Sequence, residues 1–274
     1  MVNYMHFQNK LHKLRWIAAG CFLLLVCSAV LLAGHFQMQT VCRQEDITNI
    51  PDDAAFLPNA EQADTAKEKW VALTFDDGPS KNTEPILDIL KEEQVPATFF
   101  VVTAENNEKY LPLLTRIQEE GHQIGLHSCT HEYRKVYAGT TEFWEDIKEL
   151  KKKLEPYVDD PSALTWLRFI GGSTNTVSHR YGGSDIMKNL KQQAQEQGYR
   201  TIDWNVSAED AAGGHPDAET ILHNIIKDAK EKNVCVVLMH DTKATKTTVE
   251  ALPEIIAWFR ENGYQFCTVE DLPD

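Results

Sequence analysis

Short apolar runs alternate with amphipathic segments from Lys69 to the end of the chain, and this alternation constrains the fold more than any other feature. The apolar runs are mostly rich in β-branched or aromatic residues, as buried strands are. Strict alternation indicates parallel strands joined by right-handed helical crossovers. We therefore expect an α/β fold, a (β/α)7 TIM-like barrel one strand short of the common eight. The predicted strands are Val71–Phe75, Ala97–Val102, Gln123–Leu126, Thr165–Phe169, Arg200–Trp204, Val234–Met239 and Gln265–Val269.

The segments between these strands have the 3.6-residue period of amphipathic helices. Glycine follows several helical segments, where a left-handed residue commonly ends a helix, as at Gly121, Gly198 and Gly263. The predicted helices are Glu84–Glu93, Glu142–Leu154, Asp185–Gln197, Ala218–Lys230 and Val249–Glu261.

The N-terminal region contains a long uncharged run, Trp16–Gly34, which is rich in Leu, Val and Ala. Such a run can cross a bilayer core of about 30 Å. Basic residues precede it, so the positive-inside rule places the N-terminus in the cytoplasm. A cleaved signal peptide, which would give a secreted protein, is the alternative. The predicted segments are a cytoplasmic N-terminus (1–15), a single-pass membrane anchor (16–34), an extracellular linker (35–68) and one folded domain (69–274).

Composition excludes some classes of partner. A formal net charge of −14 argues against nucleic-acid binding, which needs a basic surface. The 42% of hydrophobic residues suffices for a sizeable core. The cysteines have no close paired spacing of a disulfide framework or zinc ribbon, so their disulfide state stays open. Nothing in the sequence implies a protein partner.

Charged and polar residues follow the predicted strands, and in barrels of this kind the chemistry lies at the carboxyl ends of the strands. Asp76 and Asp77 follow the first strand, and His127 and His240 follow the third and sixth. We expect these side chains to converge on one rim. Arg168 and the pair Asp203–Trp204 join them from the ends of the fourth and fifth strands.

His131 forms a candidate metal site together with His127 and one of the two adjacent acids of the rim. His127 and His131 are four residues apart, and on one helical turn they would face the same way. Two histidines and one carboxylate make a zinc set that leaves a position open for water. The alternatives are ordinary surface or core histidines, and a simple turn at Asp76-Asp77-Gly78-Pro79. The sharp Gly-Pro favours carboxylates held at a fixed angle, one for a metal and one free as a base.

The motifs Thr74–Ser80 (TFDDGPS) and His127-Ser-x-x-His131 resemble the polysaccharide deacetylase family, also called the NodB-homology or carbohydrate esterase 4 family. The resemblance extends over residues 70–274, and five motifs occur in the family's order. The further three are Arg168–Gly172, Asp203–Trp204 and Leu238–His240.

The resemblance implies a distorted barrel and a hydrolase that removes N-acetyl groups from amino sugars of an extracellular polysaccharide. It makes Asp77, His127 and His131 ligands of a divalent metal, Zn²⁺ in the first place, with Co²⁺ or another divalent ion as alternatives. The remaining roles that it implies are Asp76 as general base paired with Arg168, His240 as general acid held by Asp203, and Gly171, Trp204 and Leu238 as substrate-binding residues.

These roles suit the hydrolysis of an amide, which is a poor electrophile with a poor leaving group. A metal lowers the pKa of bound water and polarises the carbonyl, and a carboxylate takes the water proton. A backbone N–H near Gly171 can support the oxyanion. The amine leaves once it is protonated, so His240 must be cationic, and a neighbouring carboxylate favours that form.

Membrane tethering favours the cell's own wall as the substrate, with N-acetylglucosamine or N-acetylmuramic acid of peptidoglycan as the sugar and N-acetylglucosamine as the first choice. Two alternatives stay open: an O-acetyl esterase acting on xylan-like glycans, and a catalytically silent glycan-binding protein. Ile170 stands where many family members have proline, which predicts a looser loop at the presumed oxyanion donor.

Overall fold

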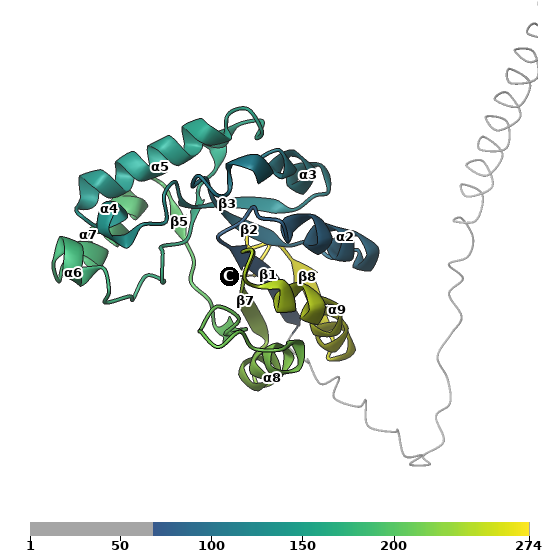
Figure 1. Ribbon diagram of the computed structural model, residues 1–274. Helices are drawn as coiled ribbons and strands as arrows, with labels where there is room; N and C mark the ends of the chain where they lie inside the picture. The colour runs from purple at the N-terminus through teal and green to yellow at the C-terminus, as the bar shows by residue number, and fades with distance from the viewer. Residues whose placement is uncertain (1–67, 274) are drawn as a thin grey trace, which may run out of the picture. The chain divides into compact units, whose positions relative to one another are not determined.

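A computed structural model describes residues 68–273 of the chain, in which eight strands form one sheet (Figure 1). All seven predicted strands are found, with shifted ends, and one more is added. The strands are β1 (Lys69–Asp76), β2 (Thr98–Val102), β3 (Gln123–Ser128), β4 (Trp166–Leu167), β5 (Arg200–Thr201), β6 (Val206–Ser207), β7 (Val234–His240) and β8 (Tyr264–Cys267).

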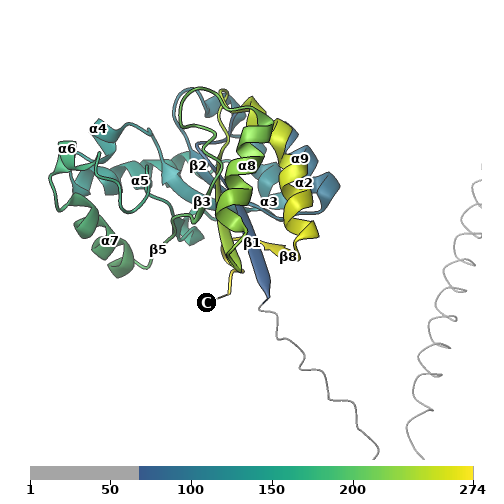
Figure 2. The ribbon, with the colours of Figure 1, turned by 90° about the horizontal axis from the view of Figure 1, so that it is seen from below.

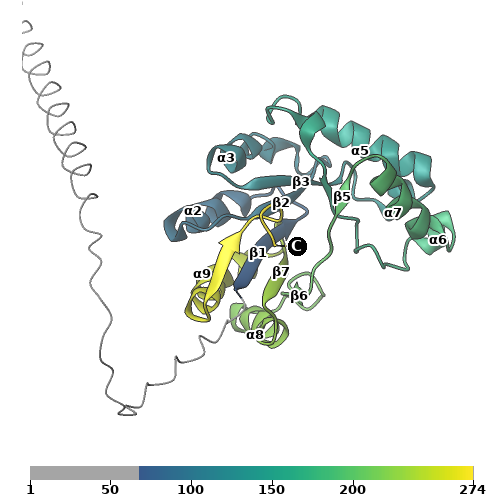
Figure 3. The same cartoon turned by 180° about the vertical axis from the view of Figure 1, so that it is seen from behind.

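The strands of this sheet are parallel and follow the order β5-β4-β3-β2-β1-β7-β6. Lys69–Ala72 of β1 pair with β8, and Thr74–Asp76 of β1 pair with β2. The first half of β1 therefore has β8 as its neighbour, and the second half has β2. Within residues 68–273 no pairing joins β5 to β6, which end the path (Figure 3). The predicted parallel α/β class is confirmed, in the form of a half-barrel.

Residues 200–207 depart from the prediction of a single strand at Arg200–Trp204. The chain instead forms two strands of two residues each, β5 beside β4 and β6 beside β7. The four residues between them therefore connect the two ends of the strand path. This division decides which acidic residue reaches the end of β7.

The five predicted helices are all present, and short helices are added to them. The predicted glycine ends are also confirmed, because Gly121, Gly198 and Gly263 all have φ between 77° and 81°. α4, α5, α6 and α7 gather near β5, whereas α2, α8 and α9 lie near β1 and β8 (Figure 2). The helices are α2 (Thr83–Glu93), α3 (Leu113–Glu119), α4 (Tyr133–Val136), α5 (Thr140–Leu154), α6 (His179–Gly182), α7 (Ile186–Glu196), α8 (Ala218–Ala229) and α9 (Lys246–Glu261), with 3₁₀ turns at Glu108–Tyr110 and Pro161–Ala163.

The two faces of β1 contribute to two different hydrophobic clusters. Successive strand residues point to opposite faces. Val71, Leu73 and Phe75 join the large hydrophobic core under the helices. Ala72 joins a small second cluster with Phe100 and Trp166. Thr74 and Asp76 continue the face of Ala72, so the pleat alone brings a carboxylate to the inner face at the end of β1.

The predicted cytoplasmic segment, the anchor at 16–34 and the linker up to residue 67 lie outside the described residues. Of the helices between residues 68 and 273, none combines the length and apolar character needed to cross a membrane. The anchor therefore stays a prediction from the sequence.

Candidate metal centre and active site

The two adjacent acids at the end of β1 point to different partners. Asp76 is buried at 3% exposure, on the inner face of the sheet. Asp77 has φ of 71°, a left-handed conformation that is uncommon outside glycine, and both carboxylates approach His127 Nε2, Asp77 Oδ1 at 3.5 Å and Asp76 Oδ2 at 3.9 Å. The side-chain amide of Asn107 holds this turn by donating to the carbonyl oxygens of Asp77 at 2.8 Å and Pro79 at 2.9 Å.

Arg168 is fully buried and pairs with Asp76, as predicted. Its Nη1 donates to Asp76 Oδ1 at 2.9 Å and to the Thr74 hydroxyl at 2.7 Å. Its other N–H groups donate to the carbonyl oxygens of Ile202 and Asp203. The guanidinium also lies 4.1 Å from the centroid of the Phe100 ring. Because only Asp76 among these partners is charged, one carboxylate oxygen is fixed and the other is left for chemistry.

Asp77, His127 and His131 come together as a candidate metal site, with their ligand atoms all within 4.8 Å of one another. Asp77 Oδ1 lies 3.0 Å from His131 Nε2 and 3.5 Å from His127 Nε2. This oxygen is buried and has no hydrogen bond of acceptable geometry within residues 68–273. A buried carboxylate oxygen without a hydrogen bond, facing two imidazole nitrogens, fits a shared divalent cation.

The tautomer of His127 also fits metal binding. Its Nδ1 lies 2.7 Å from the main-chain carbonyl oxygen of Arg168, so this nitrogen carries the proton and donates. Nε2 is then an unprotonated ligand atom facing Asp77. An imidazole whose other nitrogen donates to a carbonyl is the usual arrangement of a metal-bound histidine.

The two histidines do not lie on a helical turn, and that part of the prediction is wrong. His127 belongs to β3, and His131 follows in a loop with φ of 56°. Asp146 of α5 holds this loop, because its carboxylate accepts from the N–H groups of Cys129 and Thr130 at 2.7 and 3.1 Å. It also accepts from the hydroxyls of Ser128 and Thr130. The Ser128 hydroxyl in turn accepts from the His131 N–H at 2.8 Å.

The electrostatics of the triad favour one anion and a neutral His127. Burial opposes charge on Asp77, but the close contact with His131 and its charge, with the charges of His127 and His240, hold the pKa of Asp77 well below the usual range. Burial lowers the pKa of His127 and outweighs the charges of Asp76 and Asp77. Burial also acts against His131, yet the contact with Asp77 raises its pKa. Asp77 and His127 are thus in the forms that bind cations.

His240 ends β7 and is held by Asp210. The Asp210 carboxylate lies 2.8 Å from His240 Nδ1 and accepts from the His240 N–H at 2.8 Å. The Thr248 hydroxyl donates to the same carboxylate at 2.7 Å. Burial by itself would lower the pKa of His240, but the hydrogen bond and charge of Asp210, with the charges of Asp77 and Asp76, raise it to about 9. The imidazole is therefore a cation at neutral pH.

The prediction that Asp203 holds His240 is wrong. The Asp203 carboxylate accepts from the N–H of Ser173 at 2.8 Å and from its hydroxyl at 2.6 Å. The cause lies in the strands: Asp203 follows β5, at one end of the path, whereas Asp210 follows β6, which pairs directly with β7. Asp203 instead anchors the loop that begins at Gly171.

The loop at residues 170–172 is held in place although Ile170 stands where the family resemblance predicts proline. The Ile170 carbonyl accepts from the Tyr137 hydroxyl at 2.9 Å and from the Asn175 amide at 3.2 Å. Gly171 and Gly172 both have positive φ, of 73° and 82°. Ile170 itself is buried at 2% exposure. These hydrogen bonds and this burial provide the rigidity that the absent proline put in question.

The two remaining predicted substrate residues lie near this loop and on β7. The half-buried Trp204 has its ring beside Gly172, because a Cβ added to Gly172 would be 3.2 Å from the ring. The centroid of the same ring lies 5.8 Å from the Arg168 guanidinium. Leu238 is buried in β7, opposite Thr74 of β1. Both positions are compatible with lining a pocket, and their roles stay predictions.

The family model described as polysaccharide deacetylase matches residues 63–202, just over half of the chain. The chain belongs to the polysaccharide deacetylase family. A peptidoglycan-N-acetylglucosamine deacetylase of Bacillus cereus is 30% identical over 265 residues, which cover 88% of each protein. The solved catalytic domain of peptidoglycan N-acetylglucosamine deacetylase from Eubacterium rectale is similar with a TM-score of 0.70 and 34% identity, over 74% of this chain and 90% of that one. A Streptococcus mutans CE4 esterase is similar with a TM-score of 0.64 and 32% identity, over 74% and 86%.

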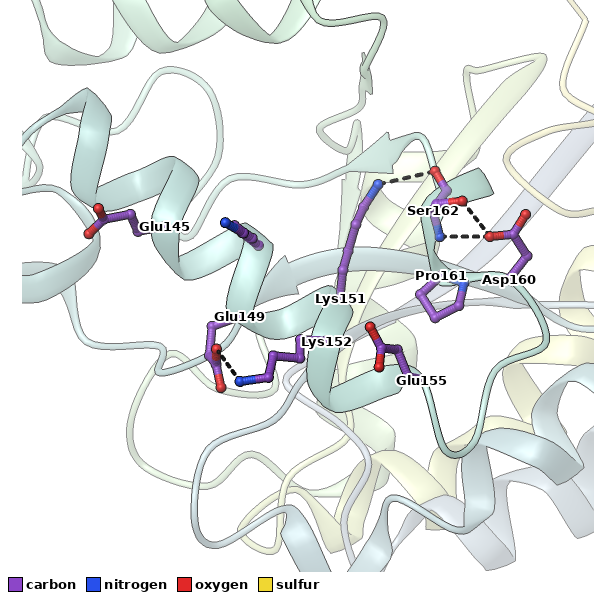
Figure 4. Close-up of a pocket in the computed structure, with 9 residues that line it drawn as sticks. Glu145, Glu149, Lys151, Lys152, Glu155, Asp160, Pro161 and Ser162 are labelled. Atoms are coloured by element: carbon purple, nitrogen blue, oxygen red, sulfur yellow. Dashed lines mark hydrogen bonds and ion pairs between the residues drawn. The ribbon is translucent and has the colours of Figure 1, made fainter.

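One groove of this deacetylase reaches the metal triad. Its volume is about 930 Å³, and it is lined by Asp77 and His131 together with residues 104–110 after β2 and 242–244 after β7. A second groove, of about 680 Å³, lies along α5 and contains no histidine (Figure 4). Of its charged residues, Lys151 donates to the Ser162 carbonyl and Lys152 lies 3.6 Å from Glu149. The first groove is therefore the one of the two that reaches the candidate metal site, while Gly171, Trp204 and Leu238 are not among the residues that line it.

Asp146→Ala is expected to lower the zinc affinity of the deacetylase about tenfold to a hundredfold, as loss of a residue that orients metal ligands commonly does. The reason is that two loop N–H groups and two hydroxyls beside His131 would lose their acceptor. Chelator competition measures the affinity. Glu145→Ala, at the exposed neighbouring position of α5, is the matched control. Unchanged affinity in Asp146→Ala would show that the loop holds His131 without Asp146.

Proposed function

We propose that the protein is a zinc-dependent N-deacetylase that acts on the N-acetylglucosamine of peptidoglycan. The observation that carries the proposal is the triad Asp77–His127–His131, because its buried carboxylate oxygen has no hydrogen bond from the part of the chain that the structure describes. Two carboxylate pairs beside the triad, Asp76–Arg168 and Asp210–His240, supply a base and an acid. The names of the Bacillus cereus and Eubacterium rectale relatives favour this substrate.

Asp77, His127 and His131 would hold the ion, which when bound lowers the pKa of a water and polarises the acetyl carbonyl. Asp76 takes the proton of the attacking water through the carboxylate oxygen that Arg168 leaves free. The N–H of Gly171 donates to the oxyanion. Protonated His240 then gives its proton to the departing amine, and Asp210 keeps the imidazole oriented and charged. The ion pairs of Asp76 with Arg168 and of His240 with Asp210 support these roles.

Acetyl ester hydrolysis is the second candidate, because a metal-activated water attacks esters more readily than amides. The Streptococcus mutans relative is named an esterase. An ester needs less help at its leaving group, so the charged His240 beside Asp210 favours the amide. A silent glycan-binding role is disfavoured by the presence of the base, the acid and all three metal ligands.

The deciding experiment is mass spectrometry of acetate loss from peptidoglycan fragments, chitooligosaccharides and acetylated xylan. We expect release from peptidoglycan fragments, loss of this activity on chelation, and recovery when Zn²⁺ is added back. Release from xylan alone would establish the esterase instead. A zinc-loaded protein that releases acetate from none of the three, while binding glycans, would support the silent role.

We also propose that residues 16–34 anchor the protein in the cell membrane, with the deacetylase domain outside. The support is the uncharged length of this run and the basic residues before it. Protease treatment of intact cells should then remove the domain and leave the N-terminal residues protected. A mature protein found free in the medium, starting within the apolar run, would show cleavage and secretion.

A further inference from the structure

Tyr133 occupies the space that a side chain at position 171 would need. A Cβ added to Gly171 would lie 2.3 Å from the Tyr133 hydroxyl oxygen and 3.5 Å from Cζ of the same ring. The first distance is an overlap and the second is an ordinary contact. Glycine at 171 therefore makes room for a phenol hydroxyl contributed by another segment of the chain.

The neighbours of Tyr133 fix it in this position. It is the first residue of α4 and follows the candidate metal ligand His131 by two residues. Its ring packs on the ring of Tyr137, with centroids 5.5 Å apart. The Tyr137 hydroxyl donates to the Ile170 carbonyl, whereas the Tyr133 hydroxyl has no hydrogen bond within residues 68–273. One tyrosine thus holds the loop, and the other presents a free donor above it.

This hydroxyl lies beside the backbone of Gly171, whose N–H we have proposed as a donor to the oxyanion. Tyr133 is half-buried and follows the candidate metal ligand His131 by two residues, so the segment that carries this ligand also brings the hydroxyl to Gly171. A donor that is already in place where negative charge develops stabilises a transition state without reorganisation. The Tyr133 hydroxyl is thus a candidate for a further donor to the acetyl oxygen, besides the N–H of Gly171.

We propose that the Tyr133 hydroxyl donates a hydrogen bond to the carbonyl oxygen of the substrate's acetyl group, beside the N–H of Gly171, and stabilises the oxyanion as it forms. The proposal rests on the proposed deacetylase function and adds a substrate-contacting residue to it. The interaction is a hydrogen bond only, and no proton leaves the phenol.

Tyr133→Phe tests the hydroxyl alone. We expect kcat to fall about tenfold to a hundredfold, the range for losing one hydrogen bond to a charged group, with little change in KM or zinc affinity. Tyr157→Phe, which removes another half-buried phenol hydroxyl after α5, should behave as wild type. A rise in KM with unchanged kcat would overturn the proposal and make Tyr133 a sugar-binding residue, and wild-type kinetics would overturn it outright.

Two further measurements separate this proposal from the proposed function. 4-Nitrophenyl acetate keeps the acetyl carbonyl but has no sugar, so its turnover reports on Tyr133 even if peptidoglycan is not the substrate. The affinity of the zinc-loaded protein for acetate, measured by NMR titration, needs no turnover. We expect Tyr133→Phe to weaken acetate binding about tenfold. An unchanged acetate affinity would count against the contact, whatever the glycan.

The placement of the hydroxyl can be tested by stability alone. Gly171→Ala should lower the Tm, through its left-handed φ and through overlap with the Tyr133 hydroxyl. Only the overlap disappears in the Tyr133→Phe background, so Gly171→Ala should lower the Tm less there. Additive effects of the two substitutions would show that the hydroxyl does not lie above Gly171.

Discussion

Asp76→Asn is expected to keep the metal ion and to lose about a hundredfold to ten-thousandfold in kcat, the usual effect of removing a general base. Asp77→Asn is expected to lose the ion, because a neutral amide is a poor ligand for a divalent cation. The two acids are adjacent, yet Asp76 is bound by Arg168 and Asp77 faces the two histidines. Elemental analysis beside turnover, for each variant, measures both effects.

Each of these variants controls for the other, since both replace one carboxylate oxygen at the end of β1. The assignment of roles fails if Asp76→Asn empties the site while Asp77→Asn retains its ion. It also fails if Asp76→Asn turns over like wild type. Another group, such as His240, would then be the one that activates the water.

His240→Ala is expected to lower kcat by about a hundredfold to ten-thousandfold, and Asp210→Asn to shift the pH profile. A general acid works only while protonated, so the wild-type rate should fall as the pH rises through the pKa of His240, which is about 9. Asp210→Asn weakens the hydrogen bond and removes the charge that raise this pKa. The alkaline limb of the kcat profile should therefore move to lower pH.

Asp203→Asn is the matched control for this experiment. Its carboxylate binds Ser173 and not His240, so the alkaline limb should stay in place. A shift in Asp203→Asn without one in Asp210→Asn would restore the pairing expected from the sequence. It would mean that the loop after β6 rearranges when substrate binds.

The pair of His240 and Asp210 also makes the stability of the fold depend on pH. The pKa of His240 in the folded protein lies above the usual value of about 6.5. The contribution of the pair to the free energy of unfolding is therefore complete below about pH 6.5 and is lost as the pH rises through about 9. As the pH rises across this range, the Tm should fall less in Asp210→Asn than in wild type. An equal fall of the Tm in the two proteins would mean that groups other than His240 cause the pH dependence.

The sequence predicted the residues at the ends of the long strands well. β1, β3 and β7 are buried runs of six to eight residues, and such runs show where a strand ends and therefore which side chain reaches the rim. Asp76, Asp77, His127 and His240 were placed at those ends, and the pairing of Asp76 with Arg168 is confirmed. These residues needed only the strand period and the parallel arrangement.

The sequence predicted the short segments poorly. β5 and β6 have two residues each, too few for a period of two to be visible. The predicted strand Arg200–Trp204 covered β5 alone, and β6 was not predicted. The acid at the end of the second strand, Asp210, was therefore missed. The apolar residues Val206 and Ala208 just before it were the only local signal.

The histidine pair illustrates a different limit. The sequence identified the right residues and the wrong backbone, because a spacing of four fits both a helical turn and a tight loop after a strand. What decides between them is Asp146, which lies fifteen residues beyond His131 and acts through tertiary contacts. Tyr133 and its relation to Gly171 were hidden for the same reason, since two segments must meet before the overlap exists.

Arg168 gives the domain a single residue on which several properties depend together. Its carbonyl orients His127, its Nη1 fixes Asp76, and its remaining N–H groups bind the carbonyl oxygens of the segment after β5. Lysine cannot reproduce the side-chain contacts, because one ammonium group lacks the planar fork of donors, whereas the main-chain carbonyl remains whatever side chain stands at 168. Substitution at this position therefore removes the partner of Asp76 and the hydrogen bonds to the segment after β5 together, so base positioning and folding depend on the same guanidinium.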